Sequence, residues 1–580
     1  MTGMCQIRDS GLGGYGHPCC AAATPNLRLR TRVAPAPQLV RQPVTNQTAS
    51  RPGTGLRVHH IRVSLSVSLV VTLLTACGGA DVASNASPVD TGSGGAGTGS
   101  SGSGSSTGGS NPPSGQIVID GSSNLAPISA DEIGTNLAVW YDVTSSDLPA
   151  QMASIKPHIL RWPGGSTADT YHWQNHTECS AKGTSVAAYS GNSTFDNFMT
   201  HVVTPGGYEG AITVDYGSNA TCTAGADPTE AAAWVAYAKS KGYNAHVHHW
   251  TVGNEVYGGW EFDLHAVKND PTTYANAVAG ASGFYQLMKA ADSTAQIGVV
   301  VTGGGSWDSI VLKNAQYDYV ELHWYAQQPG QESDTTLLFS QPGALASAIA
   351  ALHAELTAIG KGSTPIMLGE FNSVTYNQGK QTVSIVNALF TGMAFGEVLN
   401  NNVALATWWF GAGASQMCNT NDSAGLYGWQ NFGAYDLVAA NTRNSWTGCG
   451  DGTVVPESAL FPSGNAFALV SQFAVAGNHM LSATVNSSLT NVRAYAATQA
   501  DGYAVMLFNL NSAATSTVTV DITSAAANSF TATTSTYGKA QYDNSRNNVW
   551  TGPVQASLGS VGTSTTVTLP PWSMTVLLLQ

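Results

Sequence analysis

Charged side chains are scarce in this sequence. Lysine, arginine, aspartate and glutamate together make up 10% of the 580 residues, whereas an average soluble domain contains roughly 25%. Apolar residues are not scarce, since they make up 43%, and the 14 tryptophans require burial or a ligand. These numbers exclude a chain that is disordered throughout, and the length predicts two or more folded units with a neutral surface.

Positively charged residues are few after residue 62. Residues 1–62 contain eight arginines and a single acid, Asp9, so residues 63–580 hold 14 of the 22 basic and 34 of the 35 acidic residues, with a formal charge of −20. A nucleic-acid partner requires a basic surface, and so does docking on anionic lipid. We therefore expect no nucleic-acid partner and no direct lipid docking of the folded part.

The apolar run at residues 63–76 is too short to span a bilayer comfortably. It follows Arg57 and Arg62, as the apolar region of a signal peptide follows basic residues. It ends in LTAC at 74–77, which resembles a bacterial lipobox and implies that Cys77 is lipidated; an ordinary export signal is the alternative. We expect residues 57–77 to be a lipoprotein signal peptide. The mature protein is then exported and held in the cell envelope, at a bacterial outer membrane or cell surface, only by its lipid anchor.

The segments on either side of this signal carry no pattern of a folded domain. Residues 1–56 are rich in arginine and proline and lack periodicity, so we treat them as a doubtful extension from a misassigned start and leave them out of the fold. Residues 78–115 form a Gly- and Ser-rich linker, because the stretch 92–115 is almost entirely glycine, serine and threonine up to Asn111-Pro112-Pro113. This composition is typical of a flexible tether.

The cysteines also favour export. Apart from Cys77 and the cysteines of the extension, an even number remains, which suits disulfides in an oxidising compartment. Four cysteines allow three pairings, of which we favour Cys179–Cys222 and Cys418–Cys449.

Patterns that bind metal are lacking. Neither CxxC nor HExxH occurs in the sequence. His246, His248 and His249 lie close together, but on a strand the first two share one face and His249 points away. We therefore expect no metal ion and no organic cofactor.

Apolar, β-rich runs alternate with helix-like stretches over residues 133–410. The predicted helices are 228–241, 274–290, 343–359 and 380–399, and the predicted strands are 133–140, 158–162, 211–216, 248–255, 296–302, 319–325, 365–371 and 403–410. This alternation is the period of a (β/α)8 TIM barrel, which we assign to residues 116–480. A doubly wound open sheet is the alternative, but it needs a Gly-rich phosphate turn after the first strand, which Gly134-Thr135-Asn136 does not supply.

After residue 480 the pattern changes to short strands separated by turns, and helix signals vanish. The predicted strands are 491–496, 503–510, 516–522, 529–537 and 565–579. They predict a C-terminal β-sandwich over residues 481–580. A strand from the segment 116–126 could join it.

Two glutamates end predicted strands of the barrel, where catalytic groups of such enzymes lie. Glu255 ends the fourth strand and Glu370 the seventh, so both reach the same mouth. Glycoside hydrolysis requires opposed carboxylates, one to protonate the leaving oxygen and one to attack or to activate water. The alternative is that each glutamate pairs with a local arginine, which is less expected for two glutamates beside Asn254 and Tyr325.

Several motifs carry a resemblance to a known group of enzymes. WTVGNE at 250–255 and LGEFN at 368–372 resemble the paired motifs of the clan of retaining (β/α)8 glycoside hydrolases with catalytic acids on strands four and seven. RWPGG at 161–165 with YHW at 171–173 resembles the RxPGG…YxW stretch of α-L-arabinofuranosidases, and LPPWS at 569–573 resembles their last sandwich strand. The similarity covers about residues 116–580. It implies that Glu255 is the general acid/base and Glu370 the nucleophile.

The division of labour between the two glutamates has physical consequences. An acid must stay protonated near neutral pH, so we expect repulsion from Glu370 to raise the pKa of Glu255. Tyr325 is placed to hydrogen-bond Glu370 and to hold it ionised. Asn254 is placed to bind the sugar hydroxyl next to the anomeric carbon, where the contact strengthens as positive charge develops.

The roles of two further polar residues stay open. Arg161 is a candidate neighbour of the nucleophile, or forms a structural ion pair with a barrel carboxylate such as Glu321. His323 is a candidate to position the acid, or is a packed interior histidine.

Sugar rings present apolar C–H faces, so aromatic platforms are expected in the cleft. Trp408 on the eighth strand is our first choice, and Trp162, Trp140 and Trp173 are further candidates; packing in the core is the alternative for each.

We therefore predict an exported, lipid-anchored retaining glycosidase whose partner is a polysaccharide or oligosaccharide. α-L-Arabinofuranosyl side chains of plant polysaccharide are the favoured substrate. An endo-β-glucanase, xylanase, β-xylosidase or β-glucuronidase of the same clan is the first alternative. A non-catalytic surface glycan-binding lipoprotein is the second.

Overall fold

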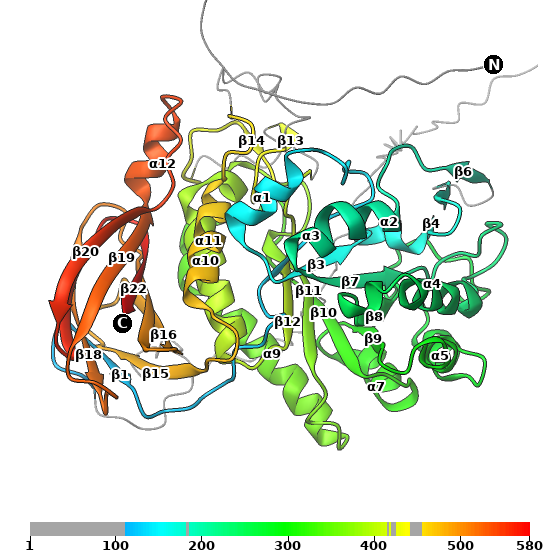
Figure 1. Ribbon diagram of the computed structural model, residues 1–580, viewed down its shortest axis with the longest axis horizontal. Helices are drawn as coiled ribbons and strands as arrows, with labels where there is room; N and C mark the ends of the chain where they lie inside the picture. The colour runs from blue at the N-terminus through cyan, green and yellow to red at the C-terminus, as the bar shows by residue number, and fades with distance from the viewer. Residues whose placement is uncertain (1–110, 181–184, 414–416, 419–424, 441–454) are drawn as a thin grey trace, which may run out of the picture. The chain divides into compact units, whose positions relative to one another are not determined.

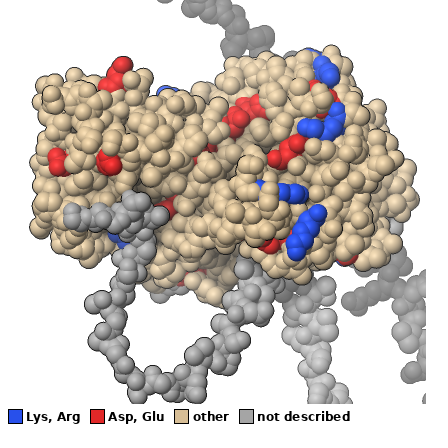
Figure 2. Space-filling model, turned by 90° about the horizontal axis from the view of Figure 1, so that it is seen from below, with Lys and Arg blue, Asp and Glu red and all other residues tan. Residues whose placement is uncertain are grey.

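The computed structural model describes residues 111–180, 185–413, 417–418, 425–440 and 455–580. The doubtful extension, the signal peptide with Cys77, and most of the linker lie outside these described residues. A search of the described residues finds no helix with the length and apolar character needed to cross a membrane. On the face seen in Figure 2, charged side chains are few and most of the surface is uncharged.

The larger part is a closed barrel of parallel strands in the order β10-β11-β12-β2-β3-β7-β8-β9 (Figure 1). Its strands are β2 (Gly134–Asn136), β3 (Ile159–Trp162), β7 (Glu209–Val214), β8 (His249–Val252), β9 (Gln296–Val301), β10 (Tyr319–Gln327), β11 (Ile366–Val374) and β12 (Leu405–Trp408). Each of the eight predicted strands is present. The (β/α)8 prediction is confirmed, and the open-sheet alternative is wrong.

Helices follow most strands, and local signals explain several of their ends. The α-helices of this part are α1 (Leu148–Ile155), α2 (Phe195–Phe198), α3 (Thr204–Gly206), α4 (Pro228–Ser240), α5 (Pro271–Ala279), α6 (Phe284–Ala291), α7 (Gly305–Asn314), α8 (Asp334–Phe339), α9 (Gln341–Ala358), α10 (Ile385–Asn400) and α11 (Pro462–Phe473). Helix α4 begins with Pro228 after Asp227, whose side chain accepts a hydrogen bond from the Thr229 backbone N–H. Proline at the first position and aspartate before it are typical of a helix start.

Two predicted helices are each divided in the structure. The segment 274–290 contains the end of α5 and most of α6, because Gly280 and Gly283 interrupt the helix; a Cβ at Gly283 would lie 2.4 Å from the Ala277 carbonyl oxygen. The segment 380–399 contains a 3-10 turn, η4 (Lys380–Val383), before α10. Ser384 separates the two and caps α10 by accepting a hydrogen bond from the Val386 N–H.

Short elements lie in the connections between the barrel strands and helices. They are η1 (Gly165–Asp169), η2 (Met199–Val203), η3 (Tyr243–Ala245), a three-stranded sheet of β4 (Tyr171–His172), β5 (Thr177–Cys179) and β6 (Val186–Ala188), and a pair of β13 (Met417–Cys418) and β14 (Phe432–Gly433). The three-stranded sheet follows β3 and η1, so it extends the carboxyl-end rim.

The smaller part is one nine-stranded sheet in the order β20-β19-β22-β17-β16-β15-β1-β18-β21. Its strands are β1 (Gln116–Asp120), β15 (Met480–Val485), β16 (Val492–Gln499), β17 (Gly502–Asn509), β18 (Ser516–Thr523), β19 (Phe530–Gly538), β20 (Val554–Val561), β21 (Ser564–Leu569) and β22 (Ser573–Leu579). One core contains residues of β18 and β21 together with residues of β17 and β22, so the sheet folds over like a sandwich. Strand β1 joins the two halves, antiparallel to β15 and parallel to β18.

The elements of this part differ from the expectation in four places. The segment 565–579 forms two strands, β21 and β22, because Pro570 and Pro571 end the first. Strands β15 and β20 were not predicted; β20 alternates apolar and polar residues only weakly, at Val554, Ala556 and Leu558, and it is exposed along nearly its whole length. Helix α12 (Lys539–Ser545) lies where no helix signal was seen.

The folded-over sheet packs on helix α10 of the barrel (Figure 1). The Tyr495 hydroxyl donates to Glu397 Oε1 at 2.7 Å. A Cβ at Gly396 would lie 2.7 Å from the Tyr495 ring, and one at Gly392 would lie 2.7 Å from Met574 Sδ. Glycines on this face of α10 therefore allow the side chains of the sheet to pack against the helix.

Candidate active site

Glu255 and Glu370 meet at the carboxyl end of the barrel. Glu255 directly follows the turn after β8, the fourth barrel strand along the chain, and Glu370 lies in β11, the seventh. Both are buried, and one oxygen of each carboxylate lies within 4.8 Å of the other and of a ring nitrogen of His323. The structure thus brings together the two glutamates that the sequence singled out.

Local backbone irregularities orient both glutamates. Strand β11 shifts register against β12 between Leu368 and Phe371, and such a bulge redirects a side chain. Gly369 precedes Glu370 because a Cβ there would lie 2.0 Å from a Glu321 carboxylate oxygen.

The turn before Glu255 is also specified by a glycine. Gly253 has φ of +75°, and a Cβ there would lie 2.5 Å from the Val256 side chain. The next backbone N–H, of Asn254, donates to Asp169 Oδ2 at 3.0 Å. Asp169 comes from the rim after β3, so contacts from another strand fix this turn.

Arg161 on β3 connects the carboxylates of the site. Its guanidinium forms ion pairs with Glu321 Oε1 at 2.8 Å and with Glu370 Oε1 at 3.0 Å, and donates to the side-chain oxygens of Asn254 at 2.8 Å and Asn136 at 3.0 Å. Both roles considered for Arg161, nucleophile neighbour and structural ion pair, are therefore present at once. Against the effect of burial, Arg161 and His323 lower the pKa of Glu321 to about 2.

His323 on β10 lies among three carboxylates. Its Nδ1 is 3.0 Å from Glu255 Oε1 and 3.7 Å from Glu370 Oε2, and its Nε2 is 3.0 Å from Glu321 Oε1. Burial alone would lower the pKa of the imidazole, but Glu370, Glu255 and Glu321 raise it to about 10. His323 is therefore an imidazolium at neutral pH, and both ring nitrogens donate.

This cation reverses the expected pKa pattern of the pair. Burial raises the pKa of Glu255, but the hydrogen bond and charge of His323 outweigh it, and the pKa lies below its ordinary value. Burial also raises the pKa of Glu370, where it outweighs His323 and Arg161, and Glu255 adds to the rise. The prediction of a raised pKa for Glu255 is wrong. It considered repulsion from Glu370 and left out the positive charge of His323, which lies 3.0 Å from Glu255.

Phenol and indole groups complete the contacts of both glutamates. The Tyr325 hydroxyl donates to Glu370 Oε2 at 2.8 Å, which is the contact expected from the sequence. The Tyr257 hydroxyl and the Trp260 indole N–H donate to the two oxygens of Glu255, each at 3.2 Å. These two were missed, although both follow Glu255 within a few residues.

Asn254 is held on both sides of its amide. Its oxygen accepts from Arg161, and its Nδ2 donates to Glu261 Oε1 at 3.1 Å. Glu261 also accepts from the Ser166 hydroxyl at 2.8 Å. Burial, Asp169 and Glu255 raise the pKa of Glu261 well above its ordinary value. Glu261 was not singled out from the sequence, because it ends no predicted strand.

The expected aromatic platforms need correction. Trp408 and Trp162 have 0% exposure; Trp408 packs in the core against Phe371 at 5.0 Å between ring centroids, and Trp162 against Phe198 at 5.3 Å. Neither ring reaches the mouth, because strand alternation turns both towards the surrounding helices.

Other rings are exposed at the carboxyl end. Trp140 and Trp260 are 38% and 39% exposed. The partly exposed Trp409 lies 6.5 Å from Trp140 between ring centroids, and a Cβ at Gly165 would lie 3.1 Å from its ring. Trp409 instead of Trp408 therefore lies at the rim, over the glycines of the RWPGG motif.

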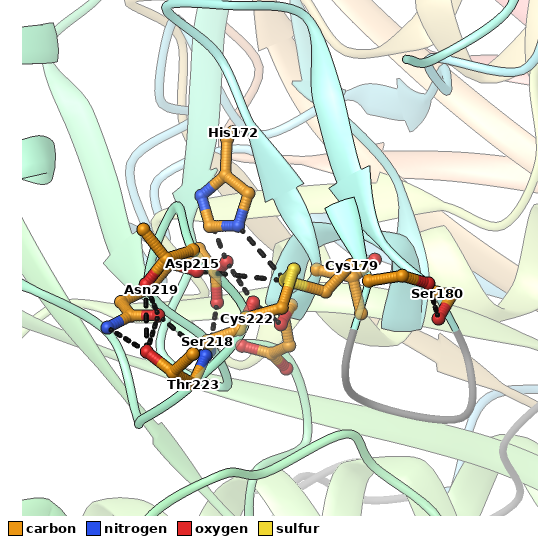
Figure 3. The surroundings of a disulfide bond; sticks show 12 residues. His172, Cys179, Ser180, Asp215, Ser218, Asn219, Cys222 and Thr223 are labelled. Atoms are coloured by element: carbon orange, nitrogen blue, oxygen red, sulfur yellow. Dashed lines mark hydrogen bonds and ion pairs between the residues drawn. A yellow bond between two sulfur atoms is a disulfide. The ribbon is translucent and has the colours of Figure 1, made fainter. Parts of the chain in front are cut away.

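A disulfide joins Cys179 on β5 to Cys222 in the loop after β7, as predicted (Figure 3). His172 lies beside it, with Nε2 3.3 Å from Cys179 Sγ and Nδ1 3.1 Å from a Glu230 carboxylate oxygen. The bond connects two rim segments that follow different barrel strands. Of the second predicted pair, Cys418 lies on β13, and Cys449 lies outside the described residues.

Among the residues that the structure describes, two side-chain groups have the composition of a cation site, but their contacts do not suit one. Glu255, His323 and Glu370 form the first, where both ring nitrogens of His323 already lie at hydrogen-bond distance from carboxylate oxygens. The second contains His172 with Cys179 and Cys222, whose sulfurs are joined to each other.

No protein-family profile matches the sequence, and no curated protein matches it. Solved structures are similar in fold. The α-L-arabinofuranosidase from Thermotoga maritima in its arabinose complex is 18% identical with a TM-score of 0.59, over 80% of this chain and 100% of that chain. The family 51 α-L-arabinofuranosidase from Bifidobacterium longum is 14% identical with a TM-score of 0.60, over 81% and 100%. A family 44 xyloglucanase from Paenibacillus polymyxa is 13% identical with a TM-score of 0.55, over 80% and 99%.

The class that fold and site define is a (β/α)8-barrel protein with a second β domain and a pair of buried glutamates at the barrel mouth. At the identities found, the likeness to arabinofuranosidases and to a xyloglucanase is one of fold, and it confirms the architecture that the sequence resemblance implied.

Proposed function

We propose that this protein is a retaining glycoside hydrolase. The observation that carries the proposal is the approach of Glu255 and Glu370, with oxygens within 4.8 Å of each other at the carboxyl end of the barrel. Carboxyl groups about 5–5.5 Å apart are typical of retention, whereas inversion needs about 6.5–9.5 Å to admit a water. The enzyme fold of the similar structures supports the same reaction class.

Glu370 is the nucleophile in this proposal. One of its oxygens attacks the anomeric carbon, the bond from that carbon to the leaving oxygen breaks, and a sugar–enzyme ester forms. Arg161 at 3.0 Å and Tyr325 at 2.8 Å orient the attacking carboxylate. Water then attacks the same carbon and releases Glu370.

Glu255 is the acid and then the base. It protonates the leaving oxygen in the first step and takes a proton from water in the second. The hydrogen bond of 3.0 Å from His323 Nδ1 to Glu255 Oε1 supplies a path by which the imidazolium proton reaches this carboxylate. When the ester forms, Glu370 loses its charge, which removes one of the carboxylates that raise the pKa of His323.

Asn254 binds the sugar hydroxyl next to the reacting carbon. Arg161 and Glu261 fix its amide plane, so the remaining N–H of the amide points in one direction. A donor fixed in advance stabilises the transition state without reorganising during the reaction.

α-L-Arabinofuranosyl side chains are the proposed substrate. The RWPGG and YHW motifs support this choice, as does the presence of arabinofuranosidases among the similar folds. A xyloglucanase has a similar fold as well, so an endo-β-glucanase, xylanase, β-xylosidase or β-glucuronidase remains the competing specificity. Nitrophenyl glycosides together with arabinan, xylan and glucan distinguish them, and NMR of the first-formed anomer tests retention.

A non-catalytic glycan-binding role is the competing class. It predicts binding to polysaccharide without release of sugar from any substrate of that screen. The hydrogen bonds and ion pairs around Glu255 and Glu370 favour turnover. A protein that only binds glycan does not need two buried carboxylates beside an arginine and a histidine.

We further propose export and lipid anchoring at Cys77. In a bacterial host, the wild-type chain is expected in the membrane fraction with an acylated N-terminal cysteine detected by mass spectrometry. The Cys77→Ser variant is expected in the soluble fraction of the envelope. A soluble wild-type protein cleaved elsewhere would show an ordinary export signal instead.

A further inference from the structure

A hollow outside the candidate active site lies between the barrel and the folded-over sheet. It has a volume of about 270 Å³. Helix α8 of the barrel forms one wall, and segments around Asn491, residues 510–512 and Trp572 of the sheet domain form the other. Helix α8 follows β10, the strand that carries His323 and Tyr325.

The floor of the hollow is apolar and rigid. Leu338, Leu510 and Trp572 line it and are buried. The Trp572 indole N–H donates to the Leu510 carbonyl at 3.0 Å, and its ring packs on the Tyr427 ring at 4.7 Å between centroids. The ring orientation is therefore fixed before any ligand arrives.

The edge of the hollow carries an exposed ring. Phe339 is 39% exposed and borders the hollow, and the Arg493 guanidinium carbon lies 5.7 Å from its ring centroid. Arg493 covers one face of this ring, so the apolar C–H face of a sugar would pack against the other.

The wall of the sheet domain offers unused hydrogen-bond donors. Asn511 Oδ1 accepts from the backbone N–H groups of Ala513 and Ala514 at 2.9 and 2.8 Å, which orients the amide. Within the described part of the chain, its Nδ2 has no partner, and neither has the side-chain amide of Asn491 or the hydroxyl of Ser512. A ligand with several hydroxyl groups would satisfy these donors.

The lining favours a neutral ligand. Asp334 is the one charged side chain among the lining residues, and its oxygens accept from Gln381 Nε2 at 2.8 Å and from the Tyr427 backbone N–H at 2.6 Å. No lysine or arginine is among the lining residues, since Arg493 only borders the hollow beside Phe339, and the Asp334 carboxylate is already hydrogen-bonded. The volume lies just below the roughly 300–1,000 Å³ of drug-sized sites, which suits a single neutral sugar residue.

We propose that this hollow is a second carbohydrate site, which binds one sugar residue of the same polysaccharide chain whose side chain or backbone is cleaved at the barrel mouth. The inference rests on the proposed function for the identity of the polymer. The site raises affinity for polymer by an effective-concentration effect, and it leaves the reaction with small substrates unchanged.

The test compares the KM for a polymer with the KM for a small substrate. Phe339→Ala removes the aromatic face, and Asn511→Asp removes the donor while keeping the oxygen that the turn needs. Leu558→Ala and Asn528→Asp are the matched controls, since Leu558 is also 39% exposed and Asn528 is exposed on the same domain away from the hollow. KM is measured on soluble arabinoxylan and on nitrophenyl α-L-arabinofuranoside.

The pocket variants are expected to raise KM on arabinoxylan roughly tenfold, with kcat on arabinoxylan and all constants on the nitrophenyl glycoside unchanged. Unchanged KM on the polymer would overturn the inference, and so would an equal rise in the controls. Affinity electrophoresis of the same variants through gels containing arabinoxylan, xylan or glucan needs no turnover. It therefore tests the second site even if the proposed function fails.

Discussion

His323 Nδ1 lies 3.0 Å from Glu255 Oε1. The imidazole carries a positive charge, since its pKa is raised to about 10, and it therefore holds Glu255 ionised. Two cations, Arg161 and His323, face three carboxylates, Glu255, Glu321 and Glu370. The group is electrically neutral when one further proton joins it, which is the state that an acid catalyst needs.

Glu370→Ala is expected to abolish turnover, by more than a thousandfold in kcat, because no other carboxylate reaches the anomeric carbon. Azide is expected to restore part of the activity and to give a glycosyl azide of inverted configuration, identified by NMR. Glu355→Ala on the outer helix α9 is the control with a carboxylate removed elsewhere. Near-wild-type activity of Glu370→Ala would end the assignment.

Glu255→Ala is expected to slow substrates with poor leaving groups by about 10²–10⁴-fold, because these need protonation. Substrates with good leaving groups, such as dinitrophenyl glycosides, are expected to form the ester at nearly the normal rate. A plot of rate against leaving-group pKa measures this difference. Equal losses for all leaving groups would contradict an acid role for Glu255.

His323 is expected to make stability depend on pH. Its pKa in the folded protein is about 10, above the ordinary 6.5. The extra stability is therefore complete below pH 6.5 and is lost as the pH rises towards 10, on the order of a few kcal/mol. Urea unfolding at pH 6 and pH 9.5 measures it, and in His323→Gln this contribution is absent. If the stability of His323→Gln changed with pH as much as that of the wild type, His323 would not carry the charge.

Trp409→Ala and Trp408→Ala are expected to act differently. Trp409 lies at the rim, so its loss is expected to raise KM with little change in the melting temperature. Trp408 is fully buried, so its loss is expected to cost about 3–5 kcal/mol of the free energy of unfolding. Kinetics and urea unfolding of both variants provide the comparison, and a reversed pattern would restore Trp408 as the platform.

Removal of the Cys179–Cys222 disulfide is expected to destabilise the rim. The two cysteines are 43 residues apart in sequence, and a loop of that length corresponds to roughly 4 kcal/mol in the chain-entropy description. The double variant Cys179→Ala/Cys222→Ala is expected to unfold at lower urea concentration than the wild type. The single variants Cys179→Ala and Cys222→Ala, which also lack the bond, are expected to show the same loss as the double variant, and a wild-type midpoint in any of the three would contradict the stabilising role.

Several features could be predicted from the sequence because they depend on short-range patterns. The eight barrel strands are apolar runs bounded by turns, and glycines precede both Glu255 and Glu370. Strand β20 was missed, because its alternation is short and includes Gly559, and because it is exposed on both faces and packs little apolar surface. Gly280 and Gly283 mark the break between α5 and α6 in the sequence. Apolar residues continue at helical spacing across them, so one helix was predicted where the structure has two.

The sequence alone determined the barrel, its order of strands, and the two glutamates that face each other across the mouth. This follows because strand alternation and chain order decide which residues stand at the carboxyl ends of a parallel barrel. Only the tertiary structure decided the charges, since His323 becomes a cation through carboxylates from other strands. It also decided that Trp409 instead of Trp408 lies at the rim, because the face that a strand turns to the mouth depends on its neighbours' register.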